Sequence, residues 1–497
     1  MQNSMQNMNK KILNATKWSM MAEVAAKLIS PIINIVLARL LLPEDFGAVA
    51  TITMVISFAE IFSDAGFQKY VVQHKFSEQS DFDKSVNVAF WSNLILSVLI
   101  VAVIFLFQKP LAQAVGSPEL HTGMVAASLS IVFVGFSSVQ TAVYRRNLDF
   151  KTLFHVRMVV SLIPLLITVP LALLFKNYWA LVIGGISKDF VCAVILTIKS
   201  SWKPRFYYSF DKLKEMLSFS LWTLFETMAI WLTSNIGIFI IGRSLSSYYL
   251  GLYKTSMTTV NSYMSIILSA VVPVLFSALS RYQDDDETFK TTFYTFQKSV
   301  AIFLLPMGVG IFFFRDLIVT ILLGSAWSEA ADFVGLWGVV YATSVVLGNL
   351  YSEVYRSKGK PKISLLIQLV HMFFLIPVLL LSVSYGFKVV FISRSAVIIQ
   401  YIITTMLVAQ CLFGIRITTT LKNIFPQVFS SILMGCVAVV LKNIHTSMLW
   451  QIASVFICII VYFSIIMLFP GMRKMVLDLD FVKSFTNKLR SPHDDKL

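Results

Sequence analysis

Three basic side chains interrupt long apolar stretches of this sequence. They are Lys27, Lys188 and Arg394. A charge at the centre of an apolar, membrane-spanning segment costs about 2.5–3.5 kcal/mol on insertion scales, so such a residue usually faces a cavity or a partner. Cations in such positions can bind anionic groups. Because Lys188 and Arg394 occupy equivalent places in an internal repeat described below, we predict a central basic cavity. Separate pairing of each cation with a neighbouring helix is the alternative.

Acidic side chains in the same stretches could carry protons or Na⁺. Glu226 has no opposite charge within one helical turn, and an unpaired carboxylate in an apolar setting takes up a proton or an ion. Asp189 directly follows Lys188, and neighbouring residues on a helix point about 100° apart, so the two cannot neutralise each other on one face. We predict ion coupling for these acids, with a hydrogen-bonded structural carboxyl as the alternative for Glu226.

Two further pairs are spaced by four residues, which brings side chains together on one face of a helix. Glu23 precedes Lys27 in the order that favours an ion pair, so this lysine either binds anions or is neutralised by its neighbour. Glu23 is also a candidate for ion coupling. Glu60 and Asp64 carry like charges that hinder each other's ionisation. They form either an ion-coupling site or a solvated pair, because Asp64 lies near the cytoplasmic end of its stretch.

The composition indicates that membrane-spanning helices carry these residues. Of 497 residues, 57% are hydrophobic and 13% are charged, with a mean hydropathy of +0.76, whereas soluble domains have about 25% charged residues. Apolar stretches of about 18 or more residues can cross the hydrocarbon core. We predict an all-α polytopic membrane protein with fourteen such helices, over residues 15–41, 45–65, 85–107, 122–144, 152–175, 177–198, 214–241, 248–279, 292–314, 330–355, 363–383, 387–411, 424–441 and 447–469.

The basic residues are distributed unevenly between the two sides of the predicted membrane. With the N-terminus inside, each outer loop holds a single Lys or Arg, and the cytoplasmic loops hold most of the others. Positively charged loops stay in the cytoplasm, so we predict that both termini are cytoplasmic. The orientation of the chain in the membrane therefore explains the net charge of +15, and this charge does not indicate nucleic-acid binding. The four cysteines form no CxxC pair, which indicates neither a disulfide framework nor a metal site.

The first half of the chain is weakly repeated in the second. Arg39 and Gly47 are matched 204 positions later by Arg243 and Gly251, and the tripeptide VYR occurs twice. We predict two parallel six-helix lobes, an arrangement in which transporters place the substrate path between the lobes. The predicted divisions are 1–205 for the N-lobe, 206–415 for the C-lobe, 416–471 for helices 13 and 14, and 472–497 for an amphipathic cytoplasmic tail.

The repeated arginines and glycines also predict a local structure. Arg39 and Arg243 end the first helix of each lobe on the outer side, where a long side chain can reach the lipid headgroups. They are structural anchors or, alternatively, part of an outer gate or cargo path. Gly47 and Gly251 would let the next helix start close to a neighbour. Lys254, near a helix end, is also expected to reach the headgroups.

The segment LARLLLPEDFGAVA, followed by FSDAGFQKYVVQ at residues 62–73, resembles the N-terminal signature of Wzx-type polysaccharide transporters. These belong to the multidrug/oligosaccharidyl-lipid/polysaccharide exporter superfamily, and the sequence is most similar to the WzxC-like group. The resemblance implies a flippase for oligosaccharides linked to undecaprenyl pyrophosphate. It also implies a cationic central cavity, for which the candidates here are Lys27, Lys188 and Arg394, with Arg39 and Arg243 at its outer end.

Two other functions stay open at this point. A drug or organic-cation antiporter of the same fold would favour an acidic cavity. A membrane-embedded polymerase or glycosyltransferase would need a sizeable outer loop, and the outer loops here are short, so we expect a transporter and not an enzyme. The expected location is the bacterial inner membrane, among membrane lipids, with a polysaccharide polymerase as a possible partner. We expect no cofactor apart from coupling to H⁺ or Na⁺.

Overall fold

A computed structural model describes residues 18, 21, 25–64, 66–74, 76, 78–200 and 202–477, with the backbone alone at 64, 218–223, 225–226, 270 and 476–477. Every regular element in this part of the chain is a helix, which confirms the predicted all-α class. Eleven of the described helices are long and apolar enough to cross a membrane. The number is twelve if the two halves of α11 (Ser247–Arg281) form one span.

The predicted segments agree with the helices to within a few residues. The segment 45–65 corresponds to α2 (Pro43–Asp64), 85–107 to α4 (Gln79–Leu106), 177–198 to α9 (Trp179–Lys199) and 214–241 to α10 (Phe210–Ser244). The first predicted segment, 15–41, lies partly outside the described residues, and its residues 25–40 are helical. Hydropathy alone therefore located the long helices.

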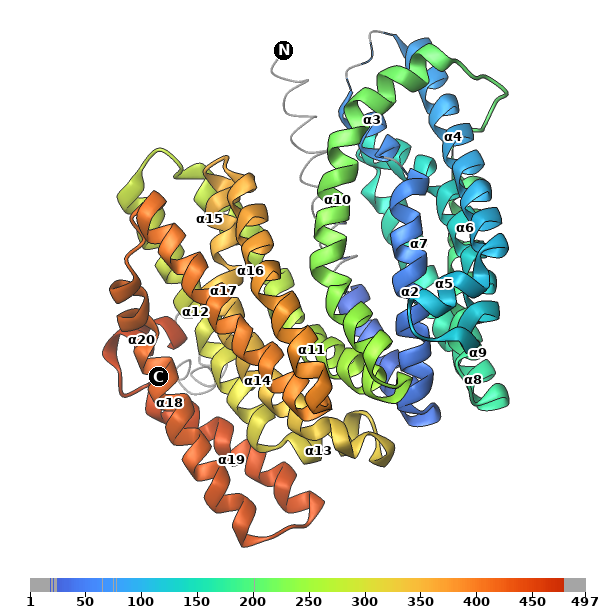
Figure 1. The fold of residues 1–497 in the computed structure, drawn as a ribbon. Helices are drawn as coiled ribbons and strands as arrows, with labels where there is room; N and C mark the ends of the chain where they lie inside the picture. The colour runs from blue at the N-terminus through green and yellow to red at the C-terminus, as the bar shows by residue number, and fades with distance from the viewer. Residues whose placement is uncertain are drawn as a thin grey trace, which may run out of the picture. The chain divides into compact units, whose positions relative to one another are not determined.

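The chain divides into two compact units, and the first comprises Met1–Ala270, Leu322–Trp327 and Gln368–Arg394. Within it, α2 and α10 run side by side, as Figure 1 shows. Its described helices are residues 25–40, α2, α3 (Phe67–Gln73), α4, α5 (Gln108–Ala114), α6 (His121–Arg146), α7 (Phe150–Ile163), α8 (Val169–Phe175), α9, α10 and most of α11.

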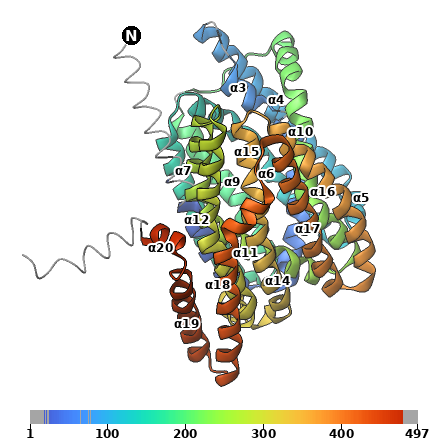
Figure 2. The ribbon, with the colours of Figure 1, turned by 90° about the vertical axis from the view of Figure 1, so that its left-hand side faces the viewer.

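The second unit comprises Val271–Ile321, Ser328–Ile367 and Ser395–Leu497. In it α18 (Ile417–Ile444) and α19 (Met448–Ile466) form a hairpin, visible in Figure 2. Its other helices are α12 (Asp286–Phe313), α13 (Arg315–Leu322), α14 (Ala331–Ser344), α15 (Tyr351–Ser357) and α20 (Pro470–Leu477). Three helices, α11, α16 (Pro361–Ser382) and α17 (Phe387–Phe413), contribute to both units, and the last residue of α13 belongs to the first. The predicted lobes, which rest on sequence similarity, stay a prediction.

Local sequence explains where several helices begin and where they are irregular. The side chain of Asp149 accepts a hydrogen bond from the backbone N–H of Thr152 at 3.1 Å, and Asp285 does the same for Thr288 at 3.1 Å, which satisfies free donors at the starts of α7 and α12. Pro164 lacks an N–H and opens a π-helical turn, Pro164–Thr168, between α7 and α8. The predicted segment 152–175 is therefore one span with an internal irregularity.

Each unit has its own apolar core. In the first unit, Phe67, Val86, Phe90 and Val139 join α3, α4 and α6. In the second, Met434, Cys458, Tyr462 and Met472 join α18, α19 and α20. Met472, the first apolar residue of the predicted amphipathic tail, is thus buried against other helices, while residues 478–497 lie outside the described part of the chain.

Candidate functional site

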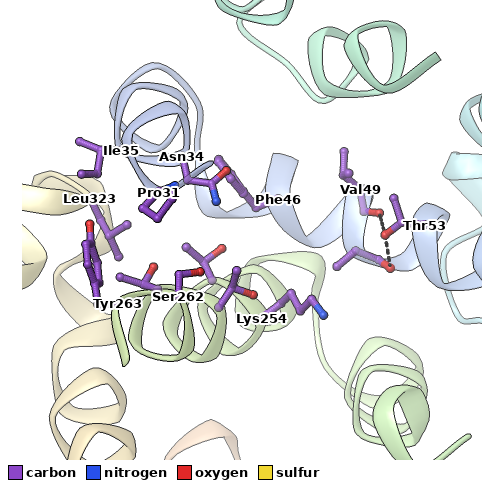
Figure 3. Close-up of a pocket in the computed structure, with 14 residues that line it drawn as sticks. Pro31, Asn34, Ile35, Phe46, Val49, Thr53, Lys254, Ser262, Tyr263 and Leu323 are labelled. Carbon is purple, nitrogen blue, oxygen red and sulfur yellow. Dashed lines mark hydrogen bonds between the residues drawn. The ribbon is translucent and has the colours of Figure 1, made fainter. Parts of the chain in front are cut away.

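A pocket of about 160 Å³ with mainly apolar walls and several polar side chains lies among three helical segments of the first unit. Its walls come from residues 25–40, α2 and α11, together with Leu323, as Figure 3 shows. Within the described part of the chain its lining includes one basic residue and no carboxylate, so a negatively charged ligand would meet a favourable potential. The polar lining residues are Asn34, Thr53, Lys254, Thr255, Thr258, Thr259, Ser262 and Tyr263.

The hydroxyl groups of the pocket follow from the sequence of α11. Thr255, Thr258, Thr259 and Ser262 have the spacing i, i+3, i+4, i+7, which places them on one face of a helix. On the facing helix, the Thr53 hydroxyl donates to the carbonyl of Val49 at 2.7 Å, so its oxygen can still accept. These hydroxyl residues carry no charge, so the charged residues of the sequence do not reveal this face of α11. The helical spacing of the hydroxyls is the sequence feature that could have predicted it.

Lys254 lines this pocket, a location that the sequence did not predict. Its position near the start of a helix suggested a side chain that reaches the lipid headgroups. In the structure it lines the pocket, one helical turn after Gly251 and on the same helix as the hydroxyl face, as Figure 3 shows. A lysine near a helix end looks the same in sequence whether it faces lipid or a cavity, and only the packing of α2 against α11 distinguishes the two.

Two glycines bring the starts of α2 and α11 into direct contact above this pocket. A Cβ atom built on Gly47 would lie 1.8 Å from the carbonyl oxygen of Ser247, the first residue of α11. A Cβ atom on Gly251 would lie 1.8 Å from the carbonyl oxygen of Pro43, the first residue of α2. Each glycine therefore meets the other helix at an equivalent position. The prediction that these glycines permit a close approach is confirmed.

Arg39 and Arg243 both lie beside loops in which a glycine has a positive φ. The guanidinium of Arg243 donates to the carbonyl oxygen of Ala114 at 2.6 Å, and a Cβ on Gly116 (φ 81°) would lie 2.7 Å from the Arg243 Cα. A Cβ on Gly324 (φ 98°) would lie 3.8 Å from Cγ of Arg39. Protein loops therefore pack against both arginines at the ends of their helices.

The structure brings together three of the predicted charged residues from two helices. Glu60 of α2 interacts electrostatically with both Lys188 and Asp189 of α9, and all three are embedded in predicted spans. Asp189 is thus an acidic neighbour of Glu60 that comes from another helix. The side chain of Asp64 lies outside the described residues, so its pairing with Glu60 stays a prediction. The described part of the chain holds no group of three or more His, Cys, Asp or Glu side chains that could bind a metal ion.

The other predicted residues lie apart from this cluster or outside the described part. Nη1 of Arg394 is 3.3 Å from Nε2 of His371, which joins α17 to α16. Lys27 is half-buried in the helix of residues 25–40. Glu23, together with the side chain of Glu226, lies outside the described residues. Lys188 and Arg394 therefore contact different partners, and a single cavity that holds both stays a prediction.

Helices that are long and apolar enough to cross a membrane, at least eleven of them in the described part of the chain, define a multi-pass membrane protein. The chain belongs to the family described as polysaccharide biosynthesis protein, whose model matches residues 36–332.

Relatives and a solved structure agree with this membership. The chain is 26% identical over 323 residues to the succinoglycan biosynthesis transport protein ExoT of Rhizobium meliloti; the match covers 64% of each chain, so it spans slightly less than two thirds of that relative. It is 22% identical over 382 residues, 76% of each chain, to the lipopolysaccharide biosynthesis protein WzxC of Escherichia coli. The fold matches a structure of the lipid II flippase MurJ in an inward closed conformation, with a TM-score of 0.75, 15% identity, and coverage of 93% of this chain and 100% of that one. The predicted Wzx-type resemblance is confirmed.

Proposed function

We propose that this protein is a flippase that moves lipid-linked oligosaccharides across the bacterial inner membrane by alternating access. The family match over residues 36–332 carries this conclusion, and relatives named for succinoglycan transport and lipopolysaccharide biosynthesis support it. The cargo would be an oligosaccharide on undecaprenyl pyrophosphate, delivered to a polysaccharide polymerase. Both chain termini would lie in the cytoplasm, because the basic loops favour that orientation.

The pocket of Figure 3 supports this function by its chemistry. A sugar–pyrophosphate headgroup cannot enter hydrocarbon without losing its hydrogen bonds to water. Lys254 and the hydroxyl face of α11 offer replacement partners to phosphate and sugar oxygens. At about 160 Å³, the pocket is smaller than the roughly 300–1,000 Å³ typical of a whole-ligand site. It would therefore hold one part of the headgroup at a time.

We extend the cationic path proposed from the sequence by adding Lys254. Lys27, Lys188 and Arg394 remain candidates for contact with the anionic cargo at other stages of the cycle. The loop contacts of Arg39 and Arg243 favour a role in closing the outer end over direct binding.

The proposal is tested by reconstituting the purified protein into liposomes that contain a lipid-linked oligosaccharide. Flipping is measured as the rate at which the sugar becomes accessible to an impermeant glycosidase. We expect protein-dependent flipping that Lys254→Ala slows on the order of tenfold or more, because a charge-assisted hydrogen bond is worth about 1.5–3 kcal/mol. Lys388→Ala, which removes an exposed lysine near the predicted outer end of α17, is the matched control and should keep the wild-type rate.

Two results would contradict this reading in different ways. Exchange of an organic cation for H⁺ or Na⁺, without flipping of any lipid-linked sugar, would establish the antiporter instead. Flipping that is the same in Lys254→Ala and wild type would keep the function but remove Lys254 from the cargo path.

We also propose that Glu60 and Asp189 couple transport to protons. With both carboxylates ionised and Lys188 charged, the cluster has a net charge of −1, and one added proton makes it neutral. Repulsion between the two acids favours this shared proton, while Lys188 stabilises the remaining carboxylate. A conformational change that alters the access of water to the cluster would then bind or release the proton.

Proton coupling predicts that a pH gradient across the liposome membrane changes the flipping rate of the wild type. In Glu60→Gln the charges of Asp189 and Lys188 cancel without an added proton, so we expect the rate of this variant to be insensitive to the gradient. Glu44→Gln, at an exposed site in the first turn of the same helix, is the control and should respond like the wild type. A wild type that ignores the pH gradient and follows a Na⁺ gradient would overturn the assignment of the coupling ion.

A further inference from the structure

An irregular segment of the first unit is held against α4 by specific contacts. Residues 202–209 have no regular secondary structure. The backbone N–H of Arg205 donates to Oδ1 of Asn87 at 2.7 Å, and its carbonyl accepts from Nε1 of Trp91 at 2.9 Å. The ring of Phe206 stacks on Trp91, with centroids 4.8 Å apart and planes 17° apart. The segment thus has a defined position without forming a helix.

The surface of this segment has the composition of a membrane–water interface. Phe206 is 94% exposed and Phe210 is 79% exposed, next to the basic residues Lys203 and Arg205. Asn87 and Trp91 lie in the first turns of the predicted span 85–107, at the end that the distribution of basic residues predicts to be cytoplasmic. Aromatic and basic side chains at that depth are typical of residues that contact lipid headgroups and the adjoining acyl chains.

Behind this surface lies a polar cavity of about 580 Å³, separate from the pocket of Figure 3. We call it the headgroup cavity. Its polar lining residues are Glu78, Gln79, Asp83, Asn87, Arg146, Asn147, Lys203 and Arg205. Its volume lies within the range of about 300–1,000 Å³ that small-molecule sites occupy. The cavity is formed by the start of α4, the end of α6 and the irregular segment.

Among the described lining residues are three cations, and the protein itself uses two of them. Arg146 donates to the backbone carbonyls of Val71 at 2.9 Å and His74 at 2.8 Å, and its guanidinium lies over the ring of Phe76 at 4.7 Å. The ammonium of Lys203 donates to the carbonyls of Thr197 and Ile198 at the end of α9. The guanidinium of Arg205 has no such partner in the described part of the chain, because its two contacts involve backbone atoms.

The cavity also contains two carboxylates whose described donors are uncharged. Glu78 accepts from the Ser80 hydroxyl at 3.1 Å, and Asp83 accepts from the Gln79 amide at 3.2 Å. A ligand with negative charge alone would be attracted by Arg205 and repelled by these acids. A ligand with both a phosphate and an ammonium group can pair its phosphate with Arg205 and its ammonium with the two carboxylates.

We propose that the headgroup cavity binds the zwitterionic headgroup of phosphatidylethanolamine from the cytoplasmic leaflet. Arg205 pairs with the phosphate, and Glu78 and Asp83 accept hydrogen bonds from the primary ammonium. The exposed rings of Phe206 and Phe210 contact the lipid's glycerol and upper acyl chains, which a soluble phosphate ester lacks. This site is distinct from the cargo path, so the lipid is a bound component of the protein and not its substrate.

The proposal is tested by lipid titration of the purified full-length protein, with bound lipid counted by native mass spectrometry. We expect phosphatidylethanolamine to bind more tightly than phosphatidylglycerol or phosphatidylcholine. Arg205→Ala should weaken phosphatidylethanolamine binding on the order of tenfold, as expected for the loss of one charge-assisted contact. Folding is not at risk in this variant, because the contacts that hold the segment use the Arg205 backbone. Arg281→Ala, an exposed arginine at the end of α11, is the matched control.

The acids provide a second and independent variant. Asp83→Asn removes a negative charge, so it should reduce the preference for phosphatidylethanolamine over phosphatidylglycerol. Equal binding of all three lipids by the wild type, or undiminished binding by Arg205→Ala, would overturn the proposal. If soluble glycerophosphoethanolamine or inorganic phosphate bound as tightly as the lipid, the claim that the ligand is a membrane lipid would be wrong.

Discussion

Gly47→Ala is expected to slow transport on the order of tenfold or more, although it adds a single methyl group. In the structure that methyl carbon would lie 1.8 Å from the carbonyl oxygen of Ser247, so α2 and α11 would have to separate by more than 1 Å at their starts. Helix backbones are not compressible in this way, and over-packing of a tight contact costs about 1–3 kcal/mol. The conformation in which the two helices touch would lose population by a corresponding factor.

The flipping rate and the outside accessibility of the pocket measure this effect together. In a variant whose four native cysteines are replaced, Thr258→Cys places a thiol in the pocket lining. Gly47→Ala should increase its labelling by an impermeant thiol reagent added outside. Gly251→Ala should behave alike, because its Cβ would meet the carbonyl of Pro43 at the same distance.

A glycine elsewhere provides the control for the helix itself. Gly185 lies inside α9, and a Cβ atom there would have no neighbour within 4 Å. Gly185→Ala should therefore keep the wild-type rate, and it also raises helix propensity. Transport at the wild-type rate by Gly47→Ala, with no change in labelling, would show that the contact between α2 and α11 is not needed for function.

The long helices and the glycine contact could be predicted from the sequence for clear physical reasons. An apolar stretch long enough to cross the hydrocarbon core has one stable backbone conformation in that setting, so hydropathy located α4, α9 and α10 to within about six residues at each end. The spacing of Arg39 and Gly47, repeated 204 positions later, identified both helix starts that touch in the structure. An arginine followed by a glycine eight residues later is a local pattern, so it can be recognised without knowing which helices are neighbours.

The pocket and the charged cluster could not be predicted, because they depend on which helices become neighbours. The sequence places Asp64 one turn from Glu60, but it does not show that α2 and α9 also bring Glu60 near Asp189, 129 positions later. Lys254 belongs to the pocket only because residues 25–40 and α2 complete the wall opposite α11. Side-chain spacing within one helix shows which residues share a face, but it does not show which other helix packs against that face.

Trp327→Ala is expected to lower the thermal stability of the protein by several degrees. Trp327 is fully buried, and its indole N–H donates to the carbonyl oxygen of Ala38 at 2.8 Å. Its ring meets Phe46 edge-on, with centroids 5.1 Å apart. The side chain thus attaches the segment Leu322–Trp327 to the end of the first helix and to α2. Truncating a buried tryptophan costs about 3–5 kcal/mol, and here it also leaves a buried carbonyl without a donor.

A graded series separates the ring from the hydrogen bond. Trp327→Phe keeps much of the apolar volume but removes the indole N–H, so it should lose about 1–3 kcal/mol, less than alanine does. Phe373→Ala is the control, because the Phe373 ring is 74% exposed and its removal leaves no internal cavity. Melting temperatures of the purified variants in one detergent give the comparison. If Trp327→Ala melted at the wild-type temperature, the segment Leu322–Trp327 would not depend on this side chain, and the packing beside Arg39 would have to be held by its backbone alone.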